Sequence, residues 1–153
     1  MIKTQAYWLC TLSLTLLSGL CQAEEATAGM IKKSRGQVTI ERSGQALPAV
    51  VGTVLLATDK LRTGADGWVG LTLRDNTLMS AGPNTLMSID KFSYDTTTNE
   101  GAMSVGVRKG TLSVATGKIA KRTPESIDFH TPTTVLGVRG TEFLVSVEGQ
   151  GDE

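Results

Sequence analysis

The residue types that could support catalysis are sparse, and the only histidine of the 153-residue chain is His130. Ser126, Asp128 and His130 occupy alternate positions, so on a strand their side chains share one face. No Gly-x-Ser-x-Gly turn surrounds Ser126, and that turn is the local structure that presents a triad nucleophile. A single histidine also cannot form a multi-histidine metal site. The sequence therefore predicts a non-enzymatic protein with no catalytic residue.

Acidic residues at expected turns are the other candidates for chemistry. Calcium ligands often occupy such positions, but no stretch resembles the calcium loop of an EF-hand. Turn aspartates usually hydrogen-bond to their own backbone instead. The glycines form neither a dinucleotide-binding fingerprint nor a phosphate-binding loop. We expect no metal, no cofactor and a structural role for the turn aspartates, which are Asp59, Asp66, Asp75 and Asp95.

The first 23 residues have the order of a secretory signal peptide. A weakly basic start with Lys3 precedes an uncharged apolar run over residues 6–20, and small residues allow cleavage after Ala23. The run is shorter than the roughly 20 apolar residues of a membrane span. Lipidation at Cys21 is the less favoured alternative, because Leu20 is large where a lipobox has a small residue. Cleavage after Ala23 removes both cysteines, so the mature chain has no disulfide.

The charge balance of the mature chain excludes two classes of partner. One of the 15 basic residues, Lys3, lies in the leader, which leaves 14 against 15 acidic residues and a net charge of −1. No basic excess is available for sequence-independent binding of nucleic acid. No polybasic run is available for a membrane surface. We therefore expect no nucleic-acid partner and no stable membrane span after signal cleavage.

Turn signals recur every 8 to 12 residues after residue 36, and no window keeps a helical apolar period. Such spacing predicts an all-β sandwich or β-roll of about ten short strands. We expect a signal peptide (1–23), a polar lead-in (24–35), the β domain (36–148) and a C-terminal tail (149–153). The strands are expected at 37–42, 50–57, 59–62, 68–73, 77–81, 85–92, 102–108, 111–115, 133–138 and 142–147.

Two polar segments interrupt this strand pattern. Residues 94–101 are predicted to form an exposed hairpin loop, and residues 117–126 a loop or half a helical turn. Phe92 and Tyr94 flank the first loop and are the candidates for a surface binding patch. Trp68, at a strand start, is expected to belong to the core.

The stretch from 131 to 147 is predicted to close the β domain. Two strands flank the corner formed by Arg139, Gly140 and Thr141. The apolar residues of 142–147 alternate with polar ones, so one face of this strand is expected to be buried. For Arg139 we expect a structural role, in which its guanidinium bridges turn carbonyls or a turn carboxylate such as Asp75, in preference to anion binding.

Four motifs in order add a resemblance to this pattern: LLATDKLRTGADGWVGLTLRDNT (55–77), AGPNTLMSI (81–89), RKGTLSV (108–114) and HTPTTVLGVRGTEFLV (130–145). From residue 50 to 147 the chain resembles the FecR domain family. Two departures are modest, since Ala57-Thr58 replaces the glycine before Asp59 and Asn76-Thr77 stands where Gly-Ser is usual. The residues expected to form the structural signature are Asp59, Thr63, Gly64, Asp75, Gly82, Pro83, Gly110, Thr131, Pro132, Arg139, Gly140, Thr141 and Phe143.

This resemblance implies a periplasmic all-β domain, known chiefly from transmembrane regulators that relay ferric-siderophore signals. Those regulators also carry a sigma-binding segment and a membrane helix, and the sequence shows neither. We therefore expect no signalling across the membrane by this chain alone. The expected function is a non-catalytic exported binding module, in signalling or another envelope role, whose partner is another cell-envelope protein. It would meet this partner through a sheet edge or the two polar loops. A carbohydrate or cell-wall binding module that uses Phe92 and Tyr94 is the alternative.

Overall fold

The computed structural model describes residues 27–140 and 142–149. Its secondary structure consists of twelve strands, one short α-helix and one 3-10 helix. The expected all-β class is therefore confirmed. The expected signal peptide, with Cys21, lies outside the described residues, as do Thr141 and residues 150–153 of the expected tail.

Most strands are short and separated by tight turns. Their bounds are β1 Thr27–Arg35, β2 Val38–Arg42, β3 Gln45–Pro48, β4 Val54–Leu56, β5 Lys60–Thr63, β6 Trp68–Leu73, β7 Leu78–Ala81, β8 Leu86–Tyr94, β9 Gly101–Ala115, β10 Ile127–His130, β11 Val135–Gly137 and β12 Glu142–Val147. The helices are α1 Lys118–Arg122 and η1 Pro124–Ser126. They occupy the polar segment for which a loop or half a helical turn was expected. Among the described residues, neither helix has the length and apolar character needed to cross a bilayer.

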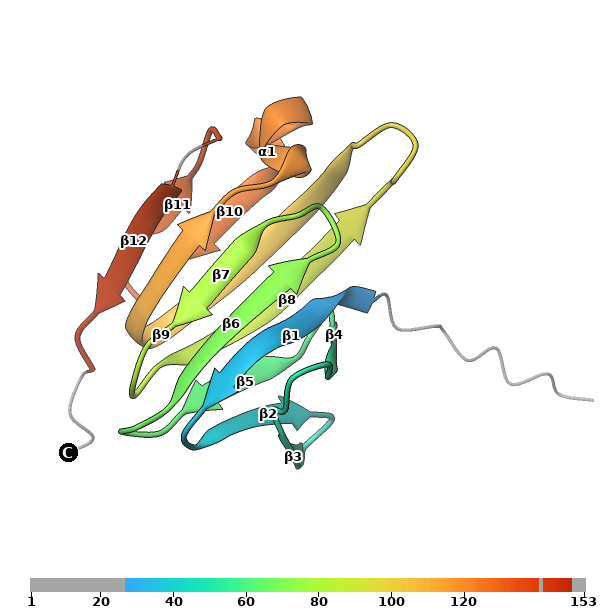
Figure 1. Cartoon of the computed structure of the whole chain (residues 1–153). Helices are drawn as coiled ribbons and strands as arrows, with labels where there is room; N and C mark the ends of the chain where they lie inside the picture. Colours follow the sequence, from blue (N-terminus) through green and yellow to red (C-terminus); the bar gives the residue numbers. More distant parts are fainter. Residues whose placement is uncertain (1–26, 141, 150–153) are drawn as a thin grey trace, which may run out of the picture.

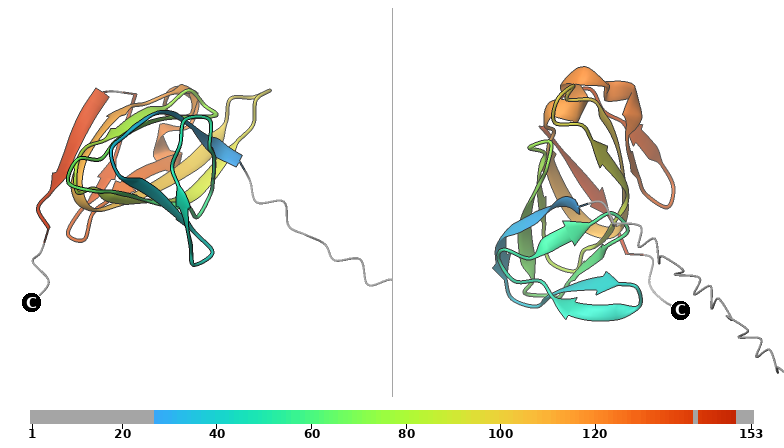
Figure 2. Two further views of the ribbon diagram at one scale, coloured as in Figure 1. Left: turned by 60° about the horizontal axis from the view of Figure 1, so that its bottom comes forward. Right: turned by 90° about the vertical axis from the view of Figure 1, so that its right-hand side faces the viewer.

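The strands form one curled sheet in the order β3-β2-β5-β8-β9-β7-β6-β1-β4, and β10, β11 and β12 branch from it at β9 (Figure 1). The pairing of β10 with β9 is parallel, and the other pairings within the described residues are antiparallel. The end-on view in Figure 2 shows the strands curling around an interior. That interior holds a single cluster of buried apolar side chains.

Strand β9 organises this curl because its two halves have different neighbours. Its first half pairs with β8 and β10, and its second half pairs with β7 and β12. The sequence pattern predicts a turn at Lys109-Gly110, and this prediction is wrong. The chain continues through Gly110 with a φ of +89°, a backbone conformation that glycine adopts without strain. The turn signal therefore marks a bend inside one long strand.

The segment expected as a polar lead-in is also different in the structure. Residues from Thr27 onward form β1, which lies between β6 and β4 in the sheet. Ala28 and Ile31 are fully buried in the core, while Lys32 and Lys33 face solvent. Long side chains with charged ends hide the strand pattern in the sequence, because only one face of the strand is apolar. The β domain thus begins before residue 36.

The two strands of the closing stretch belong to different parts of the sheet. β11 pairs with β10, and β12 pairs with β9. The alternation expected for β12 is confirmed, since Val145 is buried and Phe143 and Val147 are half-buried. The rings of Phe129 on β10 and Phe143 on β12 meet edge to face at 4.9 Å between centroids. This contact joins the two branches across the core.

Candidate binding groove

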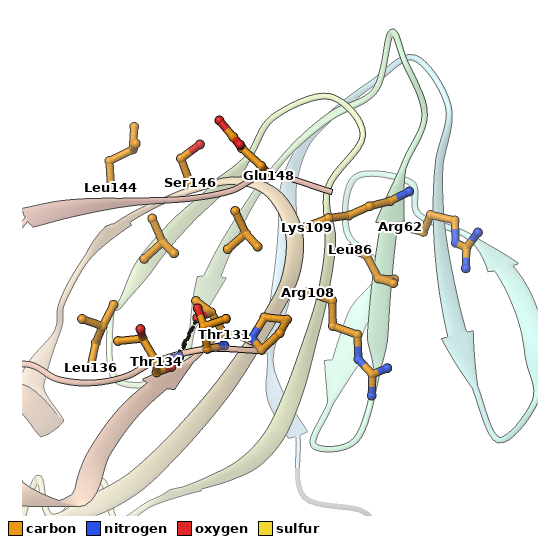
Figure 3. A pocket seen from close by; sticks show the side chains of 14 residues that line it. Arg62, Leu86, Arg108, Lys109, Thr131, Thr134, Leu136, Leu144, Ser146 and Glu148 are labelled. Atoms are coloured by element: carbon orange, nitrogen blue, oxygen red, sulfur yellow. Dashed lines mark hydrogen bonds between the residues drawn. The ribbon is translucent and has the colours of Figure 1, made fainter. Parts of the chain in front are cut away.

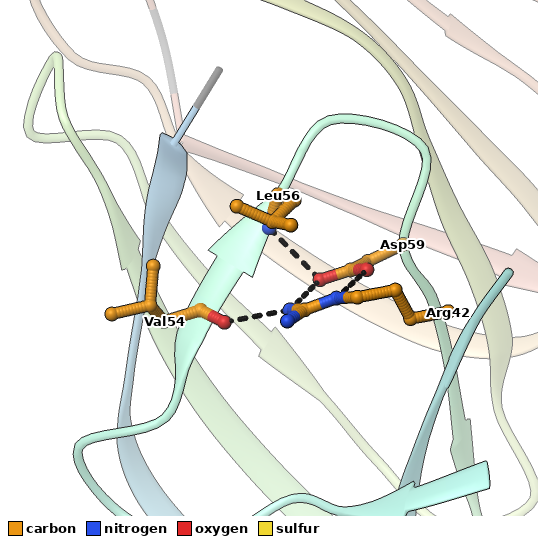
Figure 4. A network of polar contacts seen from close by, with 4 residues as sticks. All are labelled: Arg42, Val54, Leu56 and Asp59. Atoms are coloured by element: carbon orange, nitrogen blue, oxygen red, sulfur yellow. Dashed lines mark hydrogen bonds and ion pairs between the residues drawn. The ribbon is translucent and has the colours of Figure 1, made fainter. Parts of the chain in front are cut away.

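The buried carboxylate of Asp59, in the turn between β4 and β5, connects this turn to β2 and β4 (Figure 4). Its two oxygens accept hydrogen bonds from Arg42 Nε at 2.8 Å and Arg42 Nη2 at 2.7 Å. One of them also accepts from the backbone N–H of Leu56 at 2.8 Å, and Arg42 Nη2 donates to the carbonyl of Val54. Paired, bidentate contacts of this kind satisfy a buried charge. Asp59 therefore holds the β4–β5 turn against β2.

A second buried turn is built from two threonines. The hydroxyl of Thr63 donates to the carbonyl of Gly82 at 2.6 Å and accepts from the backbone N–H of Thr85 at 2.8 Å. The Thr85 hydroxyl bonds in turn to the backbone of Thr111 beside the bend in β9. A Cβ on Gly110 would collide with Thr85. Signature positions from three motifs therefore meet at one packed junction.

The third buried turn corrects the role expected for Arg139. Asp75, also fully buried, accepts from the hydroxyl of Thr77 at 2.7 Å and from its backbone N–H at 3.1 Å. The same hydroxyl accepts from the N–H of Gly117 at 3.0 Å, which fixes the entry to α1. Arg139, in contrast to the buried residues of this turn, is exposed. The carboxylate of Asp75 is satisfied by its own turn, so the expected contact of Arg139 with Asp75 is wrong, and a contact of Arg139 with turn carbonyls stays a prediction.

The aromatic surface patch expected at the β8–β9 hairpin is also not formed. Phe92 is only 4% exposed and belongs to the core, so its expected surface position is wrong. The reason is a register shift between Ile89 and Lys91, which turns Phe92 inward where simple alternation would place Lys91. Tyr94 is half-buried, and its hydroxyl donates to Oδ1 of Asn99 at 2.7 Å.

His130 lies on the outer face of the sheet between two aspartates. Its Nε2 is 3.1 Å from Oδ2 of Asp90, and its Nδ1 is 3.4 Å from Oδ2 of Asp128. The hydroxyl that donates to Asp128 is that of Ser104, at 2.7 Å, and Ser126 lies in η1 instead. Within 27–140 and 142–149, no three His, Cys, Asp or Glu side chains are grouped so as to hold a metal ion.

A groove of about 880 Å³ opens between β12 and the segment that joins β10 to β11 (Figure 3). We call it the β11–β12 groove. One wall is β12, and the other is the 131–134 turn with Leu136. Two hydrogen bonds close this turn: the backbone N–H of Thr131 donates to the carbonyl of Thr134 at 2.8 Å, and the Thr131 hydroxyl accepts from the N–H of Thr134 at 3.1 Å. Signature residues Thr131 and Pro132 thus shape the groove.

Basic side chains gather at one end of the β11–β12 groove. Arg62, Arg108 and Lys109 lie there together in Figure 3, and Glu148 is the one acidic residue among the described residues of the lining. None of these three basic side chains forms an ion pair within the described residues. The groove therefore combines an apolar wall with a cationic end.

Large apolar side chains are exposed around the same groove. Of the residues that line it, Leu144 on β12 is 65% exposed and Leu136 on β11 is 36% exposed. Val135, which precedes Leu136 on β11, is 70% exposed. Clustered exposed apolar residues with a polar rim are typical of interaction surfaces. The sequence contains these residues in the predicted closing strands, but alternation alone does not indicate that the two strands stand at two separate sheet edges.

The arrangement defines a class of protein: a curled all-β domain with buried polar turns and an open groove between two sheet edges. The family model described as FecR protein matches residues 59–153, more than half of the chain. The chain therefore belongs to the FecR family, as the sequence motifs indicate, and this is a family of non-enzymatic periplasmic signalling and interaction modules. No curated protein and no solved structure matches the chain.

Proposed function

We propose that this protein is a non-catalytic, exported binding module that contacts another cell-envelope protein through the β11–β12 groove. The observation that carries the proposal is the coincidence at one place of two sheet edges, the exposed apolar side chains of Leu136 and Leu144, and a cationic end. Protein interfaces use such apolar centres with a charged rim. The family supports an interaction role in the periplasm. The expected signal peptide is consistent with that compartment.

The carbohydrate-binding alternative finds less support in the same surfaces. Glycan binding by a small β module requires an exposed aromatic platform. Phe92 is buried and Tyr94 is half-buried, and no aromatic residue is among the described residues that line the β11–β12 groove. We therefore favour a protein partner over a glycan.

Site-specific photocrosslinking tests the proposal. A photoreactive phenylalanine analogue is placed at Leu144 beside the groove, and at Val51 as the control. The two positions are matched, since the exposed fractions of Leu144 and Val51 are 65% and 61% and Val51 lies in the β3–β4 loop. In an envelope extract of the source organism, we expect a discrete crosslinked partner from Leu144 and none from Val51.

A charge reversal provides the specificity control for this experiment. Arg108→Glu changes the sign of one residue at the cationic end, and the crosslink from Leu144 should weaken because charge complementarity contributes to specific binding. Crosslinks that arise equally from Leu144 and Val51, or none from either, would contradict the proposed function.

A further inference from the structure

We infer that β12 receives its partner by strand addition. In this mode an extended segment of another protein pairs with the free edge of β12, carrying apolar side chains at alternate positions and acidic residues at the end beside Lys109. The inference rests on the proposed function, because it assigns a binding mode to the same groove. Strand addition uses main-chain hydrogen bonds for affinity and alternate side chains for specificity.

The backbone of β12 offers unpaired groups at its outer edge. On β9, the N–H and C=O of Thr111 point away from β12, because they bond to Thr85 and to the N–H of Gly82. Backbone groups alternate in direction along a strand, so those of Leu112 point toward β12. Leu112 stands opposite Val145 in the register. The backbone N–H and C=O of Val145 therefore point toward β9 and form hydrogen bonds of this pairing.

The same alternation defines which groups of β12 remain open. Residues next to Val145 must direct their N–H and C=O away from β9. These residues are Leu144 and Ser146, and within the described residues β12 has no second neighbouring strand. An added strand would thus find donors and acceptors on both of them. Their side chains leave this edge free, since Figure 3 shows both pointing away from the 131–134 turn.

Comparison of the sheet edges singles out β12. Native proteins protect edge strands by making them very short or by placing proline or charge on them. β4 and β11 have three residues each, and β3 ends in Pro48. β12 has six residues, and its charged residues lie only at its ends: Glu142 is the first residue of the strand, and Glu148 follows the last. Its centre, with the exposed Leu144, is the least protected edge of the described sheet.

The charge near one end of β12 indicates which residue types the partner segment carries and how the segment is oriented. The cationic end formed by Arg62, Arg108 and Lys109 lies at the C-terminal end of β12, where Val147 stands opposite Gly110. An antiparallel partner places its N-terminal end there, and antiparallel pairing is slightly more stable per residue than parallel pairing. The expected partner segment therefore has acidic residues followed by a stretch that alternates apolar and polar positions.

Proline substitution at one open position tests the backbone contacts. Ser146→Pro removes an N–H that points outward, so the hydrogen bonds between β12 and β9 should be kept. Proline is tolerated on edge strands for the same reason. Ser146→Ala keeps the N–H and is the matched control. Val145→Pro removes a bond to β9 and should destabilise the fold. We expect circular dichroism and thermal unfolding of Ser146→Pro to stay close to those of the unchanged protein.

Binding is measured with a fluorescein-labelled peptide, Asp-Asp-Thr-Val-Thr-Val-Thr-Val, and a second peptide in which two lysines replace the aspartates. Fluorescence anisotropy should show that the unchanged protein and Ser146→Ala prefer the acidic peptide by about tenfold, a difference near 1.4 kcal/mol. Ser146→Pro should lose about tenfold in affinity for it. Arg108→Glu leaves two basic and two acidic side chains in the groove lining, so it should abolish the preference while leaving the edge intact. This variant keeps the inference testable even where Ser146→Pro fails to fold.

Different outcomes separate this inference from the proposed function. If Ser146→Pro folds and still crosslinks its partner from Leu144, the groove function stands and strand addition is overturned. Equal binding of both peptides by the unchanged protein, or binding of neither, also overturns it. A concentration-dependent dimer that Ser146→Pro abolishes would overturn it too, because the edge would then be occupied by a second copy of the chain.

Discussion

The buried turns and the β11–β12 groove differ in whether their polar groups have hydrogen-bond or ion-pair partners. At the buried turns, Asp59 and Asp75 are fully buried, and their oxygens accept hydrogen bonds from nearby donors. Among the described side chains, no buried nitrogen or oxygen lacks a partner. At the groove, by contrast, the basic side chains form no ion pair with any other described residue, and no described strand pairs with the outer edge of β12. Satisfied polar groups hold the fold, and open ones are available for binding.

The motifs shared with the FecR family fall mainly on the first of these two regions. Asp59, Thr63, Asp75 and Gly110 all lie at buried turns or at the bend in β9. Family resemblance therefore reports chiefly on how the domain folds. Leu144 and Ser146, on which the binding proposal depends, lie outside the structural signature. The comparison teaches that most signature residues stabilise the fold, whereas two of them, Thr131 and Pro132, also line the groove.

The largest effect is expected at the first buried turn. Asp59→Ala removes three hydrogen bonds and leaves Arg42 without its carboxylate, and breaking a buried pair in this way costs about 3 kcal/mol. Denaturant unfolding measures the loss. The exposed pair of Lys60 with Glu41 is the control, since Glu41→Ala should cost less than about 1 kcal/mol. Equal effects of the two changes would contradict a special role for Asp59.

The next effect concerns the bend in β9. Gly110→Ala forces a side chain into a left-handed backbone conformation and against Thr85, so we expect destabilisation of about 2 kcal/mol. Gly137→Ala on β11 is the matched control, because a Cβ there meets no atom within 4 Å. It should change the unfolding free energy by less than about 0.5 kcal/mol. A tolerant Gly110 would show that the bend is not required.

A smaller effect is expected beside the groove. The sequence predicts a loss of stability for Arg139→Ala, but Arg139 is exposed in the structure. We therefore expect a change of less than about 0.5 kcal/mol in the free energy of unfolding. Thermal and denaturant unfolding check this value. A large loss would restore the structural role that the family motif suggests, and it would weaken the contrast between buried turns and groove.

The smallest effect distinguishes an exposed turn aspartate from the buried ones. Hydrogen bonds from the backbone N–H of Thr97, and then of Thr98, lower the pKa of Asp95 from its ordinary value of 3.8. Because the folded pKa is the lower one, this stabilisation is present above pH 3.8 and is lost as the pH falls through the folded value. NMR titration of the Asp95 carboxyl should give a midpoint below 3.8.

Removing one donor sharpens the test of Asp95. Thr97→Pro deletes the N–H that is the first cause of the shift, so the midpoint should rise toward the ordinary value. Thr97→Val keeps the N–H and should leave most of the shift. Because Asp95 is fully exposed, global stability should hardly respond to either change. An unchanged midpoint in Thr97→Pro would show that the turn does not hold the carboxylate.

Local signals explain which parts of the fold could be predicted. The hairpin loop after Tyr94 follows from its polar residues, and the buried face of β12 follows from alternation. Phe92 was misplaced because a register shift in β8 breaks alternation, and no local residue type announces such a shift. Arg42 was missed as the partner of Asp59 because 17 positions separate them in the chain. Contacts between residues so far apart in the chain produce no periodic pattern in the sequence.

By itself, the sequence determined the all-β class, the positions of most turns and the FecR motifs, since all three depend on residues close together in the chain. Only the tertiary structure decided that β9 runs unbroken between two sets of neighbours and that β11 and β12 end up on different branches of the sheet. Strand pairing joins residues far apart in sequence, and the backbone groups that pair are the same for every residue type. Which edge remains open is therefore a property of the assembled sheet.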